Sequence, residues 1–202
     1  MNKKELFDEL REEGIKEEII KVMNLVDRKN FVPLSLRDRT YENIPLSLGP
    51  CQTISQPYTV GFMLQQLELK KGNKVLEIGT GSGWNAALIS NLVGKKGRVY
   101  TMEVVKKLAE ESKNKLAKYR NIQVIFGGGY KGLEKYASYD RIIFTAAPNR
   151  ISNETKKQLK VGGILLVPIG IGEQRLIKIK RTEKGFVEED LGAFVFVPMI
   201  EK

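Results

Sequence analysis

The stretch Lys74-Val-Leu-Glu-Ile-Gly-Thr-Gly-Ser-Gly-Trp84 decides the fold. It begins as an apolar run that contains one acid, Glu77, and this run predicts a strand. The glycines at 79, 81 and 83 predict a turn whose backbone can approach a ligand closely. The apolar run 86–93 then predicts a helix. A strand, a glycine-rich turn and a helix in this order are typical of the carboxyl edge of a parallel sheet, where such folds bind ligands.

The spacing of the glycines narrows the choice of ligand. A dinucleotide fingerprint requires G-x-G-x-x-G, whereas residues 79–83 read G-x-G-x-G and are followed by Trp84. No Gly-Lys-Ser/Thr follows the glycines, so the sequence also lacks a phosphate-cradling P-loop. We therefore expect a ligand with a ribose and an adenine that needs no phosphate contact.

A second acid supports a nucleoside ligand. Residues 98–103 predict a short strand that ends in Glu103, whose carboxylate can accept hydrogen bonds from both ribose hydroxyls. S-adenosylmethionine fits this description. Alternatively, Glu77 and Glu103 are ordinary strand-end charges and the glycines only turn the chain, but the two acids together favour the cofactor.

Length and composition indicate the number of domains and the class of protein. A chain of 202 residues with one cysteine, Cys51, predicts one globular domain without an internal disulfide. Residues 1–11 are charged throughout and resemble no signal peptide, and no apolar run approaches the ~18 residues of a membrane span. We expect a cytoplasmic monomer that does not bind membranes, with residues 1–202 as one domain and residues 1–50 as a helical extension packed on it.

The absence of histidine excludes several chemistries. Without an imidazole and with one cysteine, the chain has no Ser-His-Asp or Cys-His nucleophile and no histidine or cysteine-rich metal site. We expect no metal cofactor. A nucleophile that is already ionised at neutral pH, such as a carboxylate, suits this composition.

The net charge of +10 raises the question of a nucleic-acid partner. Most clustered lysines, such as those at 95–96, 106–107 and 113–118, lie on predicted helices or beside glutamates and indicate solvated surfaces. No finger or RNA-binding motif is present. We therefore do not favour nucleic acid as a partner.

The order of predicted elements gives the fold class. Strands alternate with helices from residue 74 to residue 168, which predicts an α/β fold with a doubly wound, mostly parallel sheet. Residues 175–181 and 193–198 predict an antiparallel C-terminal hairpin at one edge, because no helix separates them. Residues 3–11 and 15–28 predict an N-terminal helical arm, and residues 57–67 predict a further helix that begins at Ser55 or Gln56.

Taken together, these motifs resemble the protein-L-isoaspartate O-methyltransferase family over nearly the whole chain. The glycine loop alone would indicate a class I methyltransferase with a Rossmann-like sheet. The stretch Gln52-Thr-Ile-Ser55 is far more specific. Further support comes from Arg28-Lys-Asn-Phe-Val-Pro33, Thr145-Ala-Ala-Pro148 and Val167-Pro-Ile-Gly170.

The resemblance implies an enzyme that transfers a methyl group from S-adenosylmethionine to the α-carboxylate of isoaspartyl residues in damaged proteins and peptides, which starts their repair. It implies that Ser55 acts at the active site, although a serine at this position also fits a helix N-cap. The residues predicted to bind the cofactor are Thr53, Ile54, Glu77, Gly79, Thr80, Gly81, Ser82, Gly83, Glu103, Gly128 and Gly129.

Two positions depart from the family pattern. The family reads Gly-Asp-Gly, with an Asp that contacts the adenine, where this chain has Gly127-Gly128-Gly129; it usually reads Ala-Pro-His where this chain has Gln56-Pro57-Tyr58. Beside the repair enzyme, two alternatives stay open. One is a tRNA adenosine methyltransferase, which would use the basic charge, and the other is a catalytically weak relative that binds S-adenosylmethionine.

Overall fold

The computed structural model describes residues 1–49 and 52–200. The prediction about Cys51 lies outside these residues. The helices are α1 (Lys3–Glu12), α2 (Glu17–Leu25), α3 (Pro57–Gln66), α4 (Trp84–Val93), α5 (Lys106–Leu116) and α6 (Asn153–Lys157), with 3₁₀ helices η1 (Arg28–Asn30), η2 (Leu34–Arg39) and η3 (Glu134–Tyr136). The strands are β1 (Leu46–Gly49), β2 (Gln52–Ile54), β3 (Lys74–Ile78), β4 (Arg98–Glu103), β5 (Ile122–Phe126), β6 (Tyr139–Phe144), β7 (Leu159–Ile169), β8 (Arg175–Thr182) and β9 (Gly185–Ala193). Within these ranges, no helix has the length and apolarity to cross a membrane.

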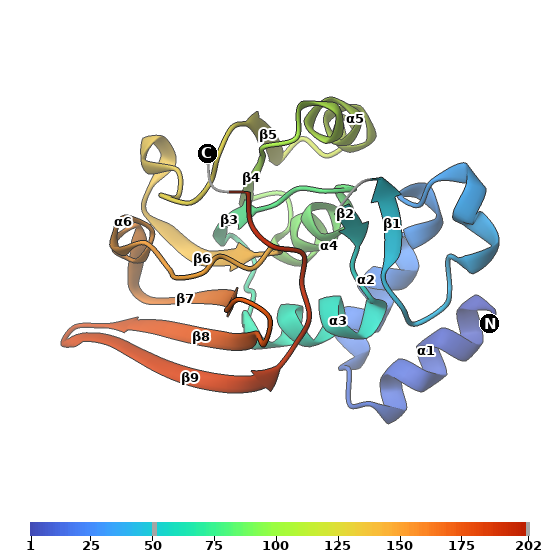
Figure 1. The fold of residues 1–202 in the computed structure, drawn as a ribbon, viewed down its shortest axis with the longest axis horizontal. Helices are drawn as coiled ribbons and strands as arrows, with labels where there is room; N and C mark the ends of the chain where they lie inside the picture. Colours follow the sequence, from blue (N-terminus) through green and yellow to red (C-terminus); the bar gives the residue numbers. More distant parts are fainter. Residues whose placement is uncertain (50–51, 201–202) are drawn as a thin grey trace.

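Seven strands form one sheet in the order β5-β4-β3-β6-β7-β8-β9. Strands β3 to β7 pair in parallel, and β8 and β9 continue the sheet antiparallel at one edge (Figure 1). The predicted fold class is confirmed. The chain builds outward from β3 to β5 and then returns to place β6 on the other side of β3. Ligands bind outside the carboxyl ends of the strands at such a reversal.

The second strand of the C-terminal hairpin was predicted at residues 193–198, and this is wrong. The partner of β8 is β9, which includes the acids Glu188, Glu189 and Asp190. Strand β9 lies at the edge of the sheet, where a strand needs no buried apolar face. Its sequence is therefore charged and lacks the apolar alternation that predicts a strand. After β9 the chain instead runs back toward the central strands (Figure 1). There Pro198 makes a parallel bridge with Ala147, which follows β6.

Alternation along the strands builds two apolar clusters on opposite faces of the sheet. Val75 joins the cluster that contains the buried residues of α2, α3 and α4, whereas its neighbour Leu76 joins the other cluster. Since side chains alternate between faces along a strand, Glu77 points to the same face as Val75. The helical arm reaches this face through α2, which packs against α3 and α4.

A single buried arginine holds the β1–β2 hairpin to the body of the molecule. The side chain of Arg28, 3% exposed, lies with its guanidinium 5.6 Å from the Trp84 ring. It donates to five main-chain carbonyl oxygens, those of Thr40, Glu42, Ile44, Ile54 and Ser55, at 2.8 to 3.4 Å. Burial lowers the pKa of Arg28 to about 10, so the group stays charged at neutral pH.

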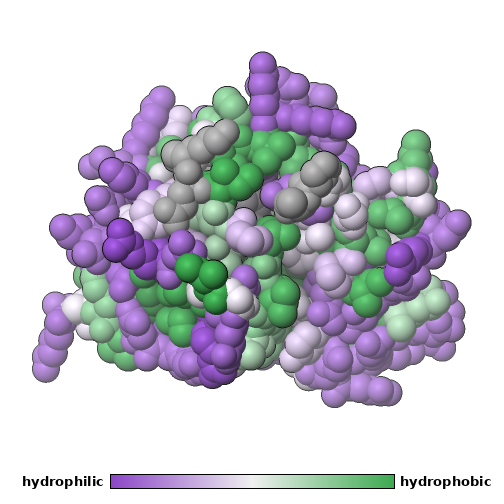
Figure 2. Space-filling model, viewed as in Figure 1, coloured by the Kyte–Doolittle hydropathy of each residue, from purple (hydrophilic) through white to green (hydrophobic). Residues whose placement is uncertain are grey.

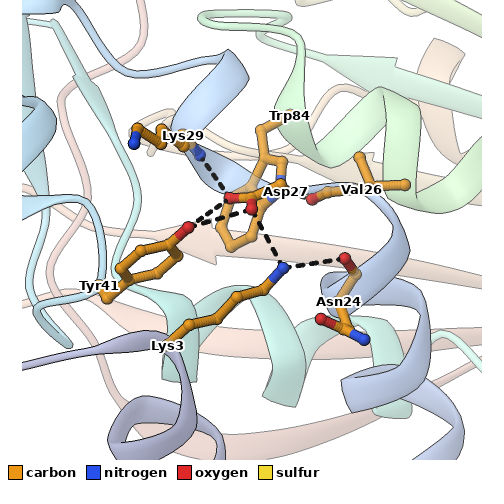
Figure 3. A network of polar contacts seen from close by, with 7 residues as sticks. All are labelled: Lys3, Asn24, Val26, Asp27, Lys29, Tyr41 and Trp84. Carbon is orange, nitrogen blue, oxygen red and sulfur yellow. Dashed lines mark hydrogen bonds and ion pairs between the residues drawn. The ribbon is translucent and has the colours of Figure 1, made fainter.

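A polar network beside Arg28 ties α1 to the same region (Figure 3). The Lys3 amine donates to the Asp27 carboxylate at 3.0 Å, and the Tyr41 hydroxyl donates to it at 3.0 Å. The Trp84 indole N–H donates to the Val26 carbonyl oxygen at 2.9 Å. The arm therefore contacts the first residue of α4, directly after the glycine loop.

Replacing Arg28 by methionine tests this anchor. Arg28→Met keeps most of the side-chain bulk but leaves five carbonyl groups without their donor, so we expect the free energy of unfolding to fall by about 3 kcal/mol or more. Arg39→Met is the matched control, because Arg39 is exposed and forms an ion pair with Glu42 at 2.8 Å. For this variant, the free energy of unfolding should fall by less than about 1 kcal/mol. Urea denaturation measures both, and equal losses would contradict the anchoring role.

Candidate active site

A cleft of about 780 Å³, including its open mouth, lies at the carboxyl ends of β3, β4 and β6. Figure 2 shows apolar residues gathered in the middle of the molecular face and hydrophilic residues around its rim. The predicted site residues that line the cleft are Thr53, Ile54, Ser55, Gly79, Thr80, Gly81, Ser82, Glu103 and Gly129.

Three predicted cofactor residues, Glu77, Gly83 and Gly128, do not line the cleft in the described structure. Gly83 caps α4 with φ +87°, and a Cβ there would lie 3.1 Å from Leu116, so it serves the packing of helix α5. Gly128 lies between two lining residues and, unlike Gly127, has no positive φ. Their contact with a cofactor stays a prediction.

The glycine loop is shaped by close approach and by backbone conformation. A Cβ on Gly79 would lie 2.2 Å from the Thr145 hydroxyl oxygen, which donates to the Gly79 carbonyl oxygen at 2.6 Å. Gly81 has φ +52°, and a Cβ there would find its nearest atoms 3.9 Å away. Gly79 therefore leaves space for Thr145, and Gly81 supplies a conformation that other residues rarely adopt.

Glu103 reaches the same loop from β4. Its two carboxylate oxygens accept from the main-chain N–H groups of Gly81 at 2.8 Å and Val105 at 2.9 Å. Each carboxylate oxygen can accept a further hydrogen bond. Glu103 therefore fixes the loop and still presents acceptors to hydroxyl groups of a ligand in the cleft.

Glu77 is wholly buried beneath the loop. Its carboxylate accepts from the Asn85 amide at 2.7 Å and from the Thr101 hydroxyl at 2.5 Å, and Thr101 in turn lies 2.7 Å from the Thr80 hydroxyl. Burial raises the pKa of Glu77 to about 7, against the effect of these two hydrogen bonds, and the Glu103 charge adds to the rise. A chain without histidine thus has a group that titrates near neutral pH.

Ser55 does not cap helix α3. The N-cap is Gln56, and the side chain that accepts from a main-chain N–H of the first turn is that of Asn43, whose amide oxygen accepts from Tyr58 at 3.0 Å. The alternative reading of Ser55 as a helix cap is therefore wrong. Ser55 lines the cleft instead, and its carbonyl oxygen accepts from Arg28 at 3.0 Å. Tyr58 is absent from the cleft lining in the described residues, and its ring lies 6.1 Å from that of Phe62.

Several lining residues were not predicted from the sequence. Thr145 and Ala146 directly follow β6, so the rule that ligands bind at strand ends could have found them. Asn85 and Val60 lie on helices, and no motif marks them. The segment 197–200 also lines the cleft, because the chain returns after β9 to the end of β6, where Pro198 bridges to Ala147.

The donor set of the cleft suits S-adenosylmethionine. Glu103 is the only charged residue of the lining in the part of the chain that the structure describes, and no lysine or arginine joins it. A cleft with one carboxylate and no cation fits a positively charged nucleoside without phosphates. Among the described residues, no three acidic or cysteine side chains come together as a metal site.

Comparison with known proteins agrees with these features. The family model described as Protein-L-isoaspartate(D-aspartate) O-methyltransferase matches residues 1–202. Proteins named Protein-L-isoaspartate O-methyltransferase are 45% identical to this chain in both Fervidobacterium nodosum, over 96% of this chain and 99% of the relative, and Ignicoccus hospitalis, over 99% and 98%.

Solved structures agree in fold. One titled protein-L-isoaspartate O-methyltransferase has a TM-score of 0.87 and 30% identity; the match covers 98% of this chain and 65% of that one. A putative protein-L-isoaspartate O-methyltransferase from Plasmodium falciparum, solved with S-adenosyl-L-homocysteine, has a TM-score of 0.89 and 23% identity over the full length of both chains.

The buried Glu77 predicts how stability depends on pH. Its pKa is raised from 4.5 to about 7 in the folded protein, so the folded state binds more protons than the unfolded state between these values. Stability should therefore fall by about 3 kcal/mol as the pH rises from 4.5 to 7, and stay level above. Glu77→Gln removes this loss, because an amide accepts from Asn85 and donates to Thr101 at every pH.

Denaturation of both proteins between pH 4.5 and pH 8 measures the effect. The Glu77→Gln variant should show a flatter profile than the wild type and a higher relative stability above pH 7. Glu111→Gln, which changes an exposed acid on α5, should leave the wild-type profile unchanged. Parallel profiles for the wild type and Glu77→Gln would contradict the raised pKa.

Proposed function

Because the chain belongs to the protein-L-isoaspartate O-methyltransferase family, it transfers a methyl group from S-adenosylmethionine to the carboxylate of isoaspartyl residues, and we propose that the transfer takes place in the cleft beside Ser55. One observation carries the proposal. Ser55, the glycine loop and Glu103 line the same cleft, although they come from the hairpin, the β3–α4 turn and β4. The cleft thus offers contacts to a substrate and to a nucleoside side by side.

The proposed cofactor contacts are of three kinds: a carboxylate acceptor, main-chain groups and an apolar surface. Glu103 accepts from the ribose hydroxyls, because its oxygens already face the loop and keep acceptor capacity. Main-chain groups of Gly79, Gly81 and Gly129 lie close to the nucleoside, and Met102 supplies an apolar surface. Gly128 offers no side-chain acceptor for the adenine. Thr53, Ile54, Thr80 and Ser82 complete the wall of the cleft.

The proposed chemistry needs no general base. S-adenosylmethionine, when bound, supplies a methyl group on a positively charged sulfur. The substrate carboxylate is ionised at neutral pH and is itself the nucleophile. The Ser55 hydroxyl donates a hydrogen bond to one carboxylate oxygen and orients the other toward the methyl group. Positioning of this kind can lower a barrier by ~7 kcal/mol or more.

We also propose that residues 1–202 work as one methyltransferase domain and as a monomer, with residues 1–50 packed on it as a helical extension. Support for the single domain comes from the buried cluster that joins Leu6 and Leu10 of the arm to Ile89 of α4. The substrates are isoaspartyl-containing proteins and peptides. Membership of the family does not favour a tRNA adenosine methyltransferase.

Ser55→Ala tests the proposed role. Loss of one hydrogen bond to a charged group, worth about 1.5 to 3 kcal/mol, should lower the turnover of an isoaspartyl peptide about ten- to a hundredfold. The affinity for S-adenosylhomocysteine should stay within about twofold, because Ser55 is placed on the substrate side. Fluorescence of Trp84, the only tryptophan and a lining residue, can follow this binding.

Ser47→Ala is the matched control, because Ser47 lies exposed on the same hairpin and outside the described cleft lining. It should leave turnover unchanged. A peptide of the same sequence with a normal aspartyl linkage serves as the control substrate. It distinguishes isoaspartyl methylation from nonspecific esterification of carboxylates. Full turnover by Ser55→Ala, or a loss of turnover matched by loss of cofactor affinity and of melting temperature, would refute the assignment of Ser55.

A further inference from the structure

One buried acceptor beside the cleft has no partner in the protein. The Asn85 side chain lies in the first turn of α4, directly after the glycine loop, and lines the cleft. Its carbonyl oxygen Oδ1 is buried and accepts no hydrogen bond from the described residues. The only other buried side-chain atom of this kind there is Arg28 Nε. Since an unpaired buried carbonyl oxygen destabilises the protein, a ligand that donates to it would remove that cost.

The orientation of the amide follows from Glu77. The Asn85 Nδ2 group donates to Glu77 Oε1 at 2.7 Å, while Glu77 Oε2 accepts from Thr101. A carboxylate can only accept, so the NH₂ end of the amide must face Glu77 and the oxygen must face away from it. Glu77 itself is fully buried and absent from the described cleft lining. The carboxylate therefore turns the unpaired oxygen of Asn85 away from itself, on a residue that lines the cleft.

The position of Asn85 relative to the sheet indicates which part of the cofactor it would contact. Glu103 ends β4 and Gly127 to Gly129 follow β5, so the contacts proposed for the ribose and adenine lie on the β4 and β5 side. Asn85 is instead joined to β3 through its hydrogen bond to Glu77, so it lies farther from β5. On the β3 side, away from the contacts proposed for the ribose and the adenine, the donor that S-adenosylmethionine presents is its α-ammonium group.

We propose that Asn85 Oδ1 accepts a hydrogen bond from the α-ammonium group of the cofactor and that Glu77 is the residue that orients it. This inference rests on the proposed placement of the nucleoside at Glu103. An ammonium group suits the position electrostatically, because the carbonyl dipole points its negative end at the ligand and the buried Glu77 carboxylate lies behind the amide. Asn85 and Glu77 together should therefore make the protein bind a cofactor with the α-amino group more tightly than one without it.

Two ligands that differ only at the amine test the inference. One is S-adenosylhomocysteine, and the other is its deamino analogue, in which a hydrogen atom replaces the α-amino group. Calorimetric titration of the wild type should show a preference of about ten- to a hundredfold for S-adenosylhomocysteine. Asn85→Leu should lose most of this preference and bind the analogue as the wild type does. Asn85→Ala also removes the oxygen but adds no bulk. It replaces the leucine variant in the titration if that variant does not fold, and the expected loss of preference is the same.

Glu103→Ala provides the control for the nucleoside. This substitution should lower the affinity for both ligands by the same factor, about tenfold or more, and keep the wild-type preference between them. If Asn85→Leu and Asn85→Ala keep that preference while Glu103→Ala weakens both ligands, the role of Asn85 is overturned and the cofactor placement stands. If Glu103→Ala changes neither affinity, the proposed cofactor placement fails instead.

Discussion

The Arg28 guanidinium is the constraint on which the architecture of the site depends. It satisfies carbonyl groups from residues 40–44 and 54–55 at once, so the segment before the hairpin and the segment after it meet at one charge. The second segment carries Ser55. The hairpin is held close over the glycine loop, with Leu48 and the Thr53 carbonyl near Gly81. The cleft is therefore formed between a parallel sheet and a hairpin that the arm holds in place.

The two acids of the sheet illustrate how position changes chemistry. Both stand on the same face near the ends of adjacent strands, yet Glu103 lines the cleft while Glu77 has no exposed surface. Glu103 can meet a ligand directly. Glu77 acts through Asn85 and Thr101, and its burial raises its pKa to about 7. A carboxylate held behind the cleft thus arranges neutral donors and acceptors around a positively charged cofactor.

Much of the fold could be predicted from the sequence because local patterns matched the final structure. The strands at 74–78 and 122–126 have the predicted bounds, and the parallel sheet with an antiparallel edge is confirmed. Strand β9 was missed because an exposed edge carries charges where an interior strand carries apolar residues. The helix predicted over 15–28 ends at Leu25 and is followed by η1, which sets Arg28 in place. In the site, the glycine loop, Ser55 and Glu103 were predicted from their motifs, whereas the place of Asn85 depends on long-range packing that no local pattern records.

The most direct test of this account is a crystal structure of the protein with S-adenosylhomocysteine and an isoaspartyl peptide. We expect the substrate carboxylate within about 2.5 to 3.0 Å of the Ser55 hydroxyl, the ribose hydroxyls at the Glu103 carboxylate, and the Arg28 contacts to residues 54 and 55 intact. A complex in which the substrate carboxylate lies away from Ser55, or in which the ribose lies away from Glu103, would contradict it.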